Sequence, residues 1–229
     1  MEILGLEKLS MVDYGDLCCA VVFTGGCNFK CPFCHNSSLV ENNVESLDTQ
    51  DVFDYLVKRK GFLDGVVVSG GEPTIHPDLP EFLKSLKEIG FKVKLDTNGT
   101  NYNMLKYLID QKLVDFVAMD IKNSPNMYPD TCGVKGLKLD NIIKSINLLK
   151  SGVVDYEFRT TLVRDYHTTQ SITEMGELVK GAKVLYLQEF VDNGTTIKGG
   201  LNEVEKTTAL EFKNVLENYV DKVFLRGYK

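Results

Sequence analysis

The sequence predicts an α/β fold, a partial (open) parallel β/α barrel of about six βα units. Apolar runs rich in β-branched residues alternate with stretches whose apolar residues recur at helical spacing, which is typical of a parallel sheet with crossover helices. The 229 residues, 43% of them hydrophobic, suffice for one sizeable core. We therefore expect a single domain over residues 1–229, with its core from about 12 to 190 and a C-terminal loop, helix and short strand from 191 to 229.

Six short apolar runs are predicted to be the strands, and their composition suits burial on both faces. They are Cys18 to Phe23, Gly65 to Val68, Phe91 to Leu95, Val114 to Met119, Tyr156 to Val163 and Lys183 to Leu187.

Helices are expected between these strands, each with an apolar stripe that packs on the sheet. One stripe comprises Leu79, Phe82, Leu83, Leu86 and Ile89, and another comprises Leu139, Ile142, Ile143, Ile146 and Leu149. Four glycines follow predicted helices, where a positive φ commonly ends a helix: Gly61, Gly90, Gly152 and Gly181. A last helix is expected near Val204 to Tyr219, after a turn-rich segment, Asp192 to Leu201, that is a candidate lid or docking loop.

Composition narrows the functional classes. The N-terminus lacks a basic start followed by a long apolar run, and no stretch approaches the ~20 apolar residues of a membrane span, so we expect a cytoplasmic protein with no membrane partner. A net charge of −6 and a pI near 5.2 argue against a nucleic-acid binder, which needs basic side chains to neutralise phosphates.

The segment CNFKCPFCHN holds three cysteines in eight residues: Cys27, Cys31 and Cys34. Without an export signal, such a cluster favours metal or redox chemistry over disulfides. The spacing alone leaves a redox pair, a haem attachment site and a zinc site open. His35 adjoins Cys34, which makes it an awkward fourth ligand, and we expect it to pack beside the site. Cys132, in a predicted loop, is expected to be an incidental thiol.

Polar motifs follow the predicted strands one after another. These are TGGCNFKCPFCHN, SGGEPT, DTNG, DIKN and QEF, and the fifth strand carries Arg159. Ligands of parallel α/β folds bind beyond the carboxyl ends of the strands, so these groups are predicted to meet at one rim. Three thiolates hold three irons of a cubane cluster and leave the fourth iron open, which suggests catalysis more than electron storage.

The cysteine loop after the first strand, with SGGEP after the second, resembles the radical S-adenosylmethionine (SAM) superfamily over roughly residues 12 to 190. Within it, VVFTGGCNFKCPFCHN, SGGEPT, LDTNG and FRTTLV resemble the glycyl-radical-enzyme activases, most closely that of anaerobic ribonucleoside-triphosphate reductase. The resemblance implies an oxidoreductase of the radical-SAM type, in which Cys27, Cys31 and Cys34 ligate a 4Fe-4S cluster whose unique iron binds SAM.

The resemblance also implies residues that contact SAM. Gly70 and Gly71 are expected to let the backbone approach the ligand, and Glu72 to accept from its ammonium group. Arg159 is expected to pair with its carboxylate, with an ion pair to Asp120 or Glu157 as the structural alternative. Further candidates are Asp96, Thr97 and Asp120 for a monovalent cation beside SAM, and Gln188 near the adenosine, where pyruvate formate-lyase activase has a histidine.

The implied activity is cleavage of SAM to a 5'-deoxyadenosyl radical that generates a glycyl radical on the reductase. After three cluster ligands, too few clustered cysteines remain for further clusters, so flavodoxin or ferredoxin is the implied electron donor. Three alternatives remain at this point: an activase of another glycyl-radical enzyme such as pyruvate formate-lyase, a small-molecule enzyme such as 7-carboxy-7-deazaguanine synthase, and a zinc or haem binding module.

Overall fold

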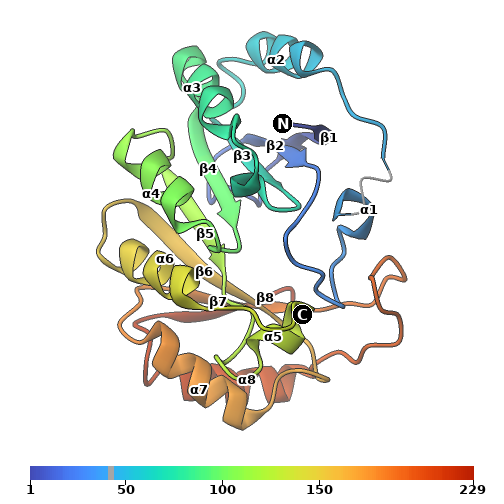
Figure 1. Cartoon of the computed structure of the whole chain (residues 1–229), viewed down its shortest axis with the longest axis vertical. Helices are drawn as coiled ribbons and strands as arrows, with labels where there is room; N and C mark the ends of the chain where they lie inside the picture. The colour runs from blue at the N-terminus through green and yellow to red at the C-terminus, as the bar shows by residue number, and fades with distance from the viewer. Residues whose placement is uncertain (41–43) are drawn as a thin grey trace.

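The computed structural model describes residues 1–40 and 44–229 and is built on one eight-stranded sheet. The strands lie side by side in the order in which the chain forms them, from β1 to β8. The first pair is antiparallel, and every later pair is parallel. Helices cover the outer side of the curved sheet, from α2 and α3 at one end to α7 and α8 at the other (Figure 1).

The strands are β1 (Ile3–Ser10), β2 (Cys19–Thr24), β3 (Gly65–Gly70), β4 (Lys92–Thr97), β5 (Phe116–Asp120), β6 (Asp155–Leu162), β7 (Leu185–Glu189) and β8 (Val223–Arg226). The helices are α1 (Ser37–Val40), α2 (Thr49–Lys58), the 3-10 turn η1 (Pro73–Ile75), α3 (Leu79–Ile89), α4 (Tyr102–Asp110), α5 (Tyr128–Thr131), α6 (Asp140–Lys150), α7 (Thr169–Val179) and α8 (Lys206–Leu216).

Local sequence signals explain where several helices begin and end. The Asp48 side chain accepts from two backbone N–H groups at the start of α2. Thr168 and Ser171 form a reciprocal capping box at the start of α7. Gly90 closes α3 in the left-handed conformation, and the three other glycines predicted to end helices also have positive φ.

The predicted parallel sheet is confirmed. All six predicted strands are present, with ends shifted by at most two residues, and the expected short C-terminal strand is β8. The sequence analysis did not predict β1, because an antiparallel edge strand with one solvated face needs no continuous apolar run. Its exposed residues include Glu7 and Lys8.

One predicted apolar stripe needs a correction. In α6, Ile142 and Ile146 are buried, but Ile143 is 40% exposed. Residues 142, 146 and 149 follow helical spacing, whereas residue 143 is rotated by about 100° toward solvent. The stripe of α3 is correct for its first four members, which are buried.

The inner side of the sheet carries a small apolar cluster and, beside it, a buried ion pair. Tyr14, Cys19, Val21 and Val67 form the cluster, and Cys18 stays partly exposed. Lys94 is the register partner of Val67, and its buried ammonium lies 3.5 Å from a Glu157 oxygen. A barrel interior filled in this way supports a site only at its open, carboxyl-terminal rim.

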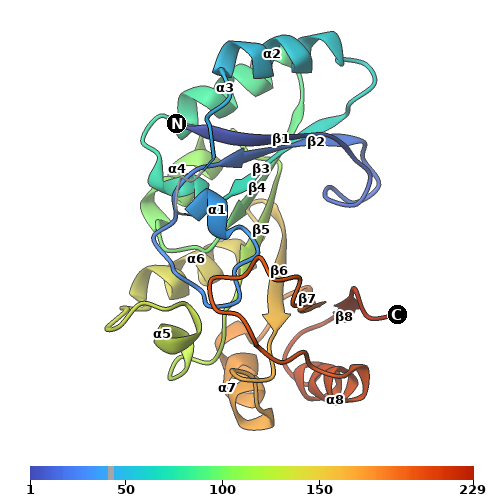
Figure 2. The same cartoon turned by 90° about the vertical axis from the view of Figure 1, so that its right-hand side faces the viewer.

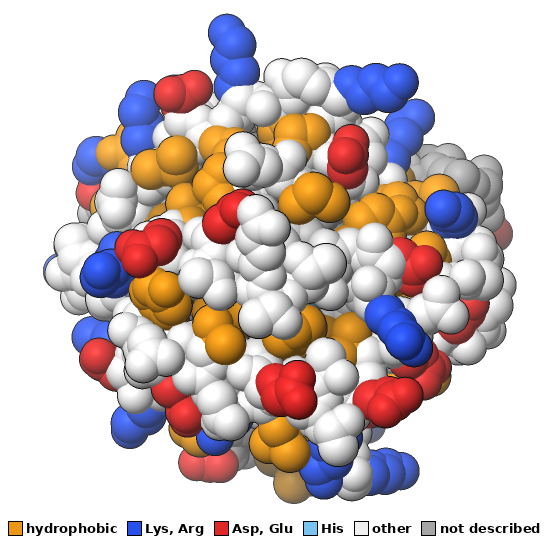
Figure 3. All heavy atoms as spheres, turned by 90° about the horizontal axis from the view of Figure 1, so that it is seen from below, with side chains coloured by type: hydrophobic (Ala, Val, Ile, Leu, Met, Phe, Trp, Pro, Cys, Tyr) orange, Lys and Arg blue, Asp and Glu red, His pale blue; other side chains and the backbone are white. Residues whose placement is uncertain are grey.

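The outer surface is chemically mixed. On the face shown in Figure 3, acidic and basic side chains are interspersed among apolar and neutral ones, with no continuous region of one sign. Across residues 1–40 and 44–229, none of the helices has the length and apolar character needed to cross a membrane.

Candidate active site

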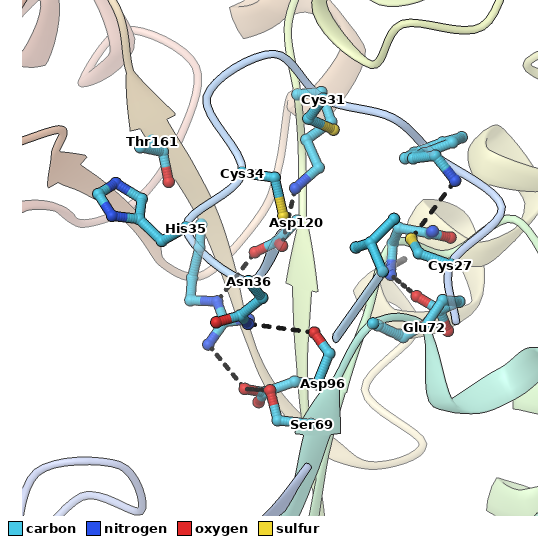
Figure 4. Close-up of a pocket in the computed structure, with 18 of the residues that line it drawn as sticks. Cys27, Cys31, Cys34, His35, Asn36, Ser69, Glu72, Asp96, Asp120 and Thr161 are labelled. Carbon is cyan, nitrogen blue, oxygen red and sulfur yellow. Dashed lines mark hydrogen bonds and ion pairs between the residues drawn. The ribbon is translucent and has the colours of Figure 1, made fainter. Parts of the chain in front are cut away.

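A cavity of about 270 Å³ opens at the carboxyl ends of the strands. All three cysteines of the CNFKCPFCHN segment line it, together with every SAM-contacting candidate named from the sequence. The predicted convergence of the strand-end motifs on one rim is thus observed (Figure 4). The lining residues that carry the argument below are Cys27, Cys31, Cys34, Glu72, Asp96, Asp120, Lys122 and Arg159.

Three distant segments hold the cysteine loop. Next to Cys27, the Glu72 N–H donates to the Gly26 carbonyl at 2.9 Å. Before Cys31, the Lys30 N–H donates to the carbonyl of Cys132 at 2.9 Å. After Cys31, the N–H of Lys198 donates to the Pro32 carbonyl at 2.8 Å. The loop is therefore a fixed part of the fold, although it has little regular secondary structure.

The surroundings of the three thiols are apolar. Phe29 and Phe33, between the cysteines, are buried in the core. Burial raises the pKa of Cys27 to about 11 and that of Cys31 to about 12, and it also raises the pKa of Cys34. Because iron binds the thiolate, assembly of a cluster here must displace these protons.

The donor set fits an iron-sulfur cluster. Across residues 1–40 and 44–229, no three His, Cys, Asp or Glu side chains lie close enough together to share a single metal ion. A cubane cluster requires no such meeting point, because each thiolate binds a different iron. One buried thiol and two partly buried thiols line one cavity beside buried aromatic side chains, which is an arrangement that suits such a cluster.

Both carboxylate oxygens of the buried Glu72 accept hydrogen bonds from protein donors. Its Oε1 accepts from the Thr74 N–H and from the hydroxyls of Thr74 and Thr97, and its Oε2 accepts from the Asn98 N–H at 2.6 Å. Burial raises the pKa of Glu72, while these hydrogen bonds act in the opposite direction. Glu72 thus joins the SGGEP and LDTNG motifs through one carboxylate.

The two glycines before Glu72 allow two backbones to touch. A Cβ on Gly71 would lie 1.7 Å from the Gly26 oxygen, and one on Gly70 would lie 2.3 Å from the Thr24 nitrogen. Gly70 also has a φ of +117°, which strongly favours glycine. The observed close approach is to the strand end that leads into the cysteine loop, and approach to a ligand remains a prediction.

Arg159 lies between two carboxylates on the cavity floor. Its Nη1 lies 3.2 Å from an Asp96 oxygen and its Nε lies 3.0 Å from an Asp120 oxygen. Burial raises the pKa of Asp120, but the positive charges of Lys122 and Arg159 outweigh this effect and lower the pKa to about 2. Of the alternatives weighed from the sequence, the ion pair with Asp120 is present, and Asp96 is a second partner.

Lys122 is a site residue that the sequence analysis missed. The DIKN motif was noted, yet no role was given to its lysine. The ammonium group lies 3.0 Å from an Asp120 oxygen, on the cavity wall that also carries the cysteines. The sequence signal that could have identified Lys122 is its position two residues after Asp120, the polar end of β5.

The remaining candidates lie at the edge of the cavity or outside it. Gln188, at the end of β7, lines the cavity. His35 packs edge-on against Phe190, with ring centroids 5.4 Å apart, so a packing role agrees with the structure. Cys132 is buried, and its thiol hydrogen-bonds only weakly, at 3.6 Å to the Pro129 carbonyl.

Comparison with known proteins identifies the family. The sequence model described as "Radical SAM superfamily" matches residues 21–180, which is more than half of the chain. The chain belongs to the radical SAM superfamily. It is 34% identical to an inferred glycyl-radical enzyme activating enzyme of Methanocaldococcus jannaschii, over 97% of this chain and 94% of the relative. It is 26% identical to the pyruvate formate-lyase-activating enzyme of Clostridium pasteurianum, over 91% and 87% of the two chains.

The solved structures agree on the fold. Streptococcus suis SuiB bound to S-adenosylmethionine superposes with a TM-score of 0.69 at 16% identity, over 90% of this chain and 50% of that one. This radical SAM protein is therefore an enzyme of the glycyl-radical activating branch, and its cofactors are those of the family, a 4Fe-4S cluster and SAM.

Proposed function

We propose that this radical SAM enzyme generates a glycyl radical on anaerobic ribonucleoside-triphosphate reductase. One observation carries the proposal: the three cysteines line the same cavity as Arg159 and Glu72, in a chain that matches an activating enzyme along nearly its whole length. The motifs VVFTGGCNFKCPFCHN and LDTNG, which resemble those of the reductase activases, support this partner over others.

When bound, a reduced 4Fe-4S cluster would supply the electron for cleavage of the sulfonium bond of SAM into methionine and a 5'-deoxyadenosyl radical. Cys27, Cys31 and Cys34 would hold the cluster. The task of the remaining residues is to hold the reacting carbon of SAM near the glycine Cα and to exclude water and stray hydrogen donors. The buried Phe29 and Phe33 serve that exclusion on the cluster side.

The hydrogen-bonding capacity left at the site supports the proposed SAM contacts. Arg159 uses its Nε and Nη1 for the two aspartates, which leaves Nη2 donors for the carboxylate of SAM. Glu72 Oε2 accepts one hydrogen bond in this structure, which leaves an acceptor position for the ammonium group. The backbone at Gly70 and Gly71, and Gln188 near the adenosine, complete the proposed set.

The proposed monovalent cation would lie beside Asp96, Thr97 and Asp120. The buried Oδ1 of Asp96 has no hydrogen-bond partner among residues 1–40 and 44–229, and an oxygen of that kind suits a hard cation. The Thr97 hydroxyl donates its hydrogen to Glu72, so the same hydroxyl oxygen would bind the cation through a lone pair.

Electrons must come from outside, and we propose flavodoxin or ferredoxin as the donor. The three cysteines outside the cavity are separated, because Cys18 and Cys19 lie at the start of β2 and Cys132 follows α5, so they do not form a second ligand set of the same kind. A cluster built on free thiols also fits the reducing conditions of the cytoplasm, which is the proposed location.

Pyruvate formate-lyase is the alternative partner, favoured by the identity with the Clostridium pasteurianum enzyme. The test is to incubate the reconstituted, reduced enzyme and SAM with each candidate partner and to record the electron paramagnetic resonance spectrum. We expect a glycyl radical doublet on the reductase and none on a reductase whose target glycine is alanine. A doublet on pyruvate formate-lyase alone would replace the proposed partner, and no doublet on either would reject both.

A further inference from the structure

The segment that supports Cys31 is a compact turn formed by the short helix α5 and the residues that follow it. The turn comprises residues 128–134, and its Cys132 carbonyl accepts the Lys30 N–H at 2.9 Å. Only the backbone of Cys132 takes part in this contact. Cys31 itself is buried and lies directly after Lys30 in the cysteine loop.

Gly133 permits this contact to form. A Cβ at this position would lie 2.2 Å from the Lys30 oxygen and 2.9 Å from the Lys30 carbonyl carbon. Both atoms belong to the backbone, so the clash is relieved only by moving the cysteine loop or the turn. Gly133 also has a φ of +67°, in the left-handed region.

The turn is firmly anchored on its other side. The buried Asn123 side chain donates to the Thr131 hydroxyl at 2.9 Å and to the Tyr166 carbonyl at 2.8 Å. Tyr128 is fully buried, and its hydroxyl donates to the Asp120 carbonyl at 3.4 Å. Because the turn is held in this way, a side chain at position 133 would displace the backbone at Lys30, and with it the neighbouring Cys31.

We propose that the turn of residues 128–134, through the absent side chain of Gly133, positions Cys31 to bind its iron. The same turn contacts the backbone of Asp120, so one rigid unit fixes both a cluster ligand and a wall of the cavity. Gly133 is not among the residues that line the cavity, and its role is to position Cys31.

Gly136 provides a matched control in the same loop. It has a φ of +71°, and a Cβ there would meet no atom within 4 Å. Asparagine tolerates positive φ better than most residues, so substitution by asparagine limits the backbone strain at both sites. The variants Gly133→Asn and Gly136→Asn then differ mainly in the clash with Lys30.

Both variants are reconstituted anaerobically with iron and sulfide, and the release of iron to a chelator is followed together with the spectrum of the reduced cluster. We expect release from Gly133→Asn to be faster than from Gly136→Asn by roughly 10-fold to 100-fold, the effect typical of losing support outside the ligand shell. Its cluster spectrum should also change, while Gly136→Asn should match the wild type. Equal release rates and equal spectra in the two variants would overturn the proposal.

Amide hydrogen exchange provides a second measurement if Gly133→Asn does not fold. In the reconstituted wild type, the Lys30 amide should exchange as slowly as the Cys132 amide, which is bonded within the same turn. A Lys30 amide that exchanges at the rate of an exposed group would show that the turn does not hold the cysteine loop.

Discussion

At the scale of single residues, Glu72 shows how one carboxylate organises the rim. Its four hydrogen bonds come from residues 74, 97 and 98, so it fixes the loops after β3 and β4 relative to each other. A buried carboxylate that accepts from fixed donors is stabilising, whereas replacing it by a group that mismatches those donors costs the desolvation of the groups left unpaired.

Replacing Glu72 by glutamine should therefore destabilise the protein. The two threonine hydroxyls are able to rotate, but the N–H groups of Thr74 and Asn98 are fixed donors, and one of them would face the new amide nitrogen. We expect the free energy of unfolding to fall by about 1–3 kcal/mol. Urea unfolding of Glu72→Gln measures this, with the exposed helix residue Glu81→Gln as control; equal stability of the two variants would contradict the account of Glu72.

At the scale of elements, the loops after the parallel strands are cross-linked by buried polar groups. The buried His167, which precedes α7, connects the loop after β5 to the loop after β6. Its Nε2 lies 3.0 Å from the Lys122 carbonyl, and its Nδ1 lies 3.0 Å from the Val163 nitrogen. A carbonyl only accepts, so Nε2 carries the hydrogen. Nδ1 also lies 3.0 Å from the Val163 carbonyl, and in the neutral ring it accepts from the Val163 N–H. Neutral imidazole satisfies both contacts.

Burial lowers the pKa of His167, and this makes stability depend on pH. The unfolded chain binds the proton more tightly, so stability is fully present above the unfolded pKa of about 6.5 and declines as pH falls below it toward the folded pKa. His167→Gln keeps one donor and one acceptor without the titration. We expect the loss of unfolding free energy between pH 7.5 and pH 5.5 to be smaller in His167→Gln than in the wild type, as measured by urea unfolding at each pH. Equal losses would contradict this.

Much of the sheet and the cysteine loop followed from the sequence, because buried parallel strands leave continuous apolar runs and the cysteine spacing is specific. The edge strand β1 was not predicted, because one of its faces is solvated and carries polar side chains that interrupt the apolar run. Lys122 was missed because a lone lysine after a strand is usually a surface residue. The partners of Glu72 and the contact of Gly133 with Lys30 depend on segments that meet only in the folded chain, so no local pattern encodes them.

At the scale of the whole molecule, the segment of residues 191–200 closes the rim across the open side of the sheet. It leaves the end of β7 and reaches the cysteine loop after β2, where Lys198 bonds Pro32 and the Ser37 hydroxyl donates to the Thr195 carbonyl at 2.7 Å. Figure 2 shows this segment beside the chain that precedes α1. The gap between β1 and β8 is thus bridged at the level of the cavity. These contacts hold the predicted lid or docking loop against the cysteine loop and the start of α1.

The central claim is that the three cysteines of this cavity support reductive cleavage of SAM. The most direct test is to reconstitute the wild type, Cys31→Ala and Cys132→Ala with iron and sulfide, reduce each with dithionite, add SAM and quantify 5'-deoxyadenosine. We expect product from the wild type and from Cys132→Ala, whose backbone contact is kept, and none from Cys31→Ala. A cluster-loaded wild type that forms no 5'-deoxyadenosine would contradict it.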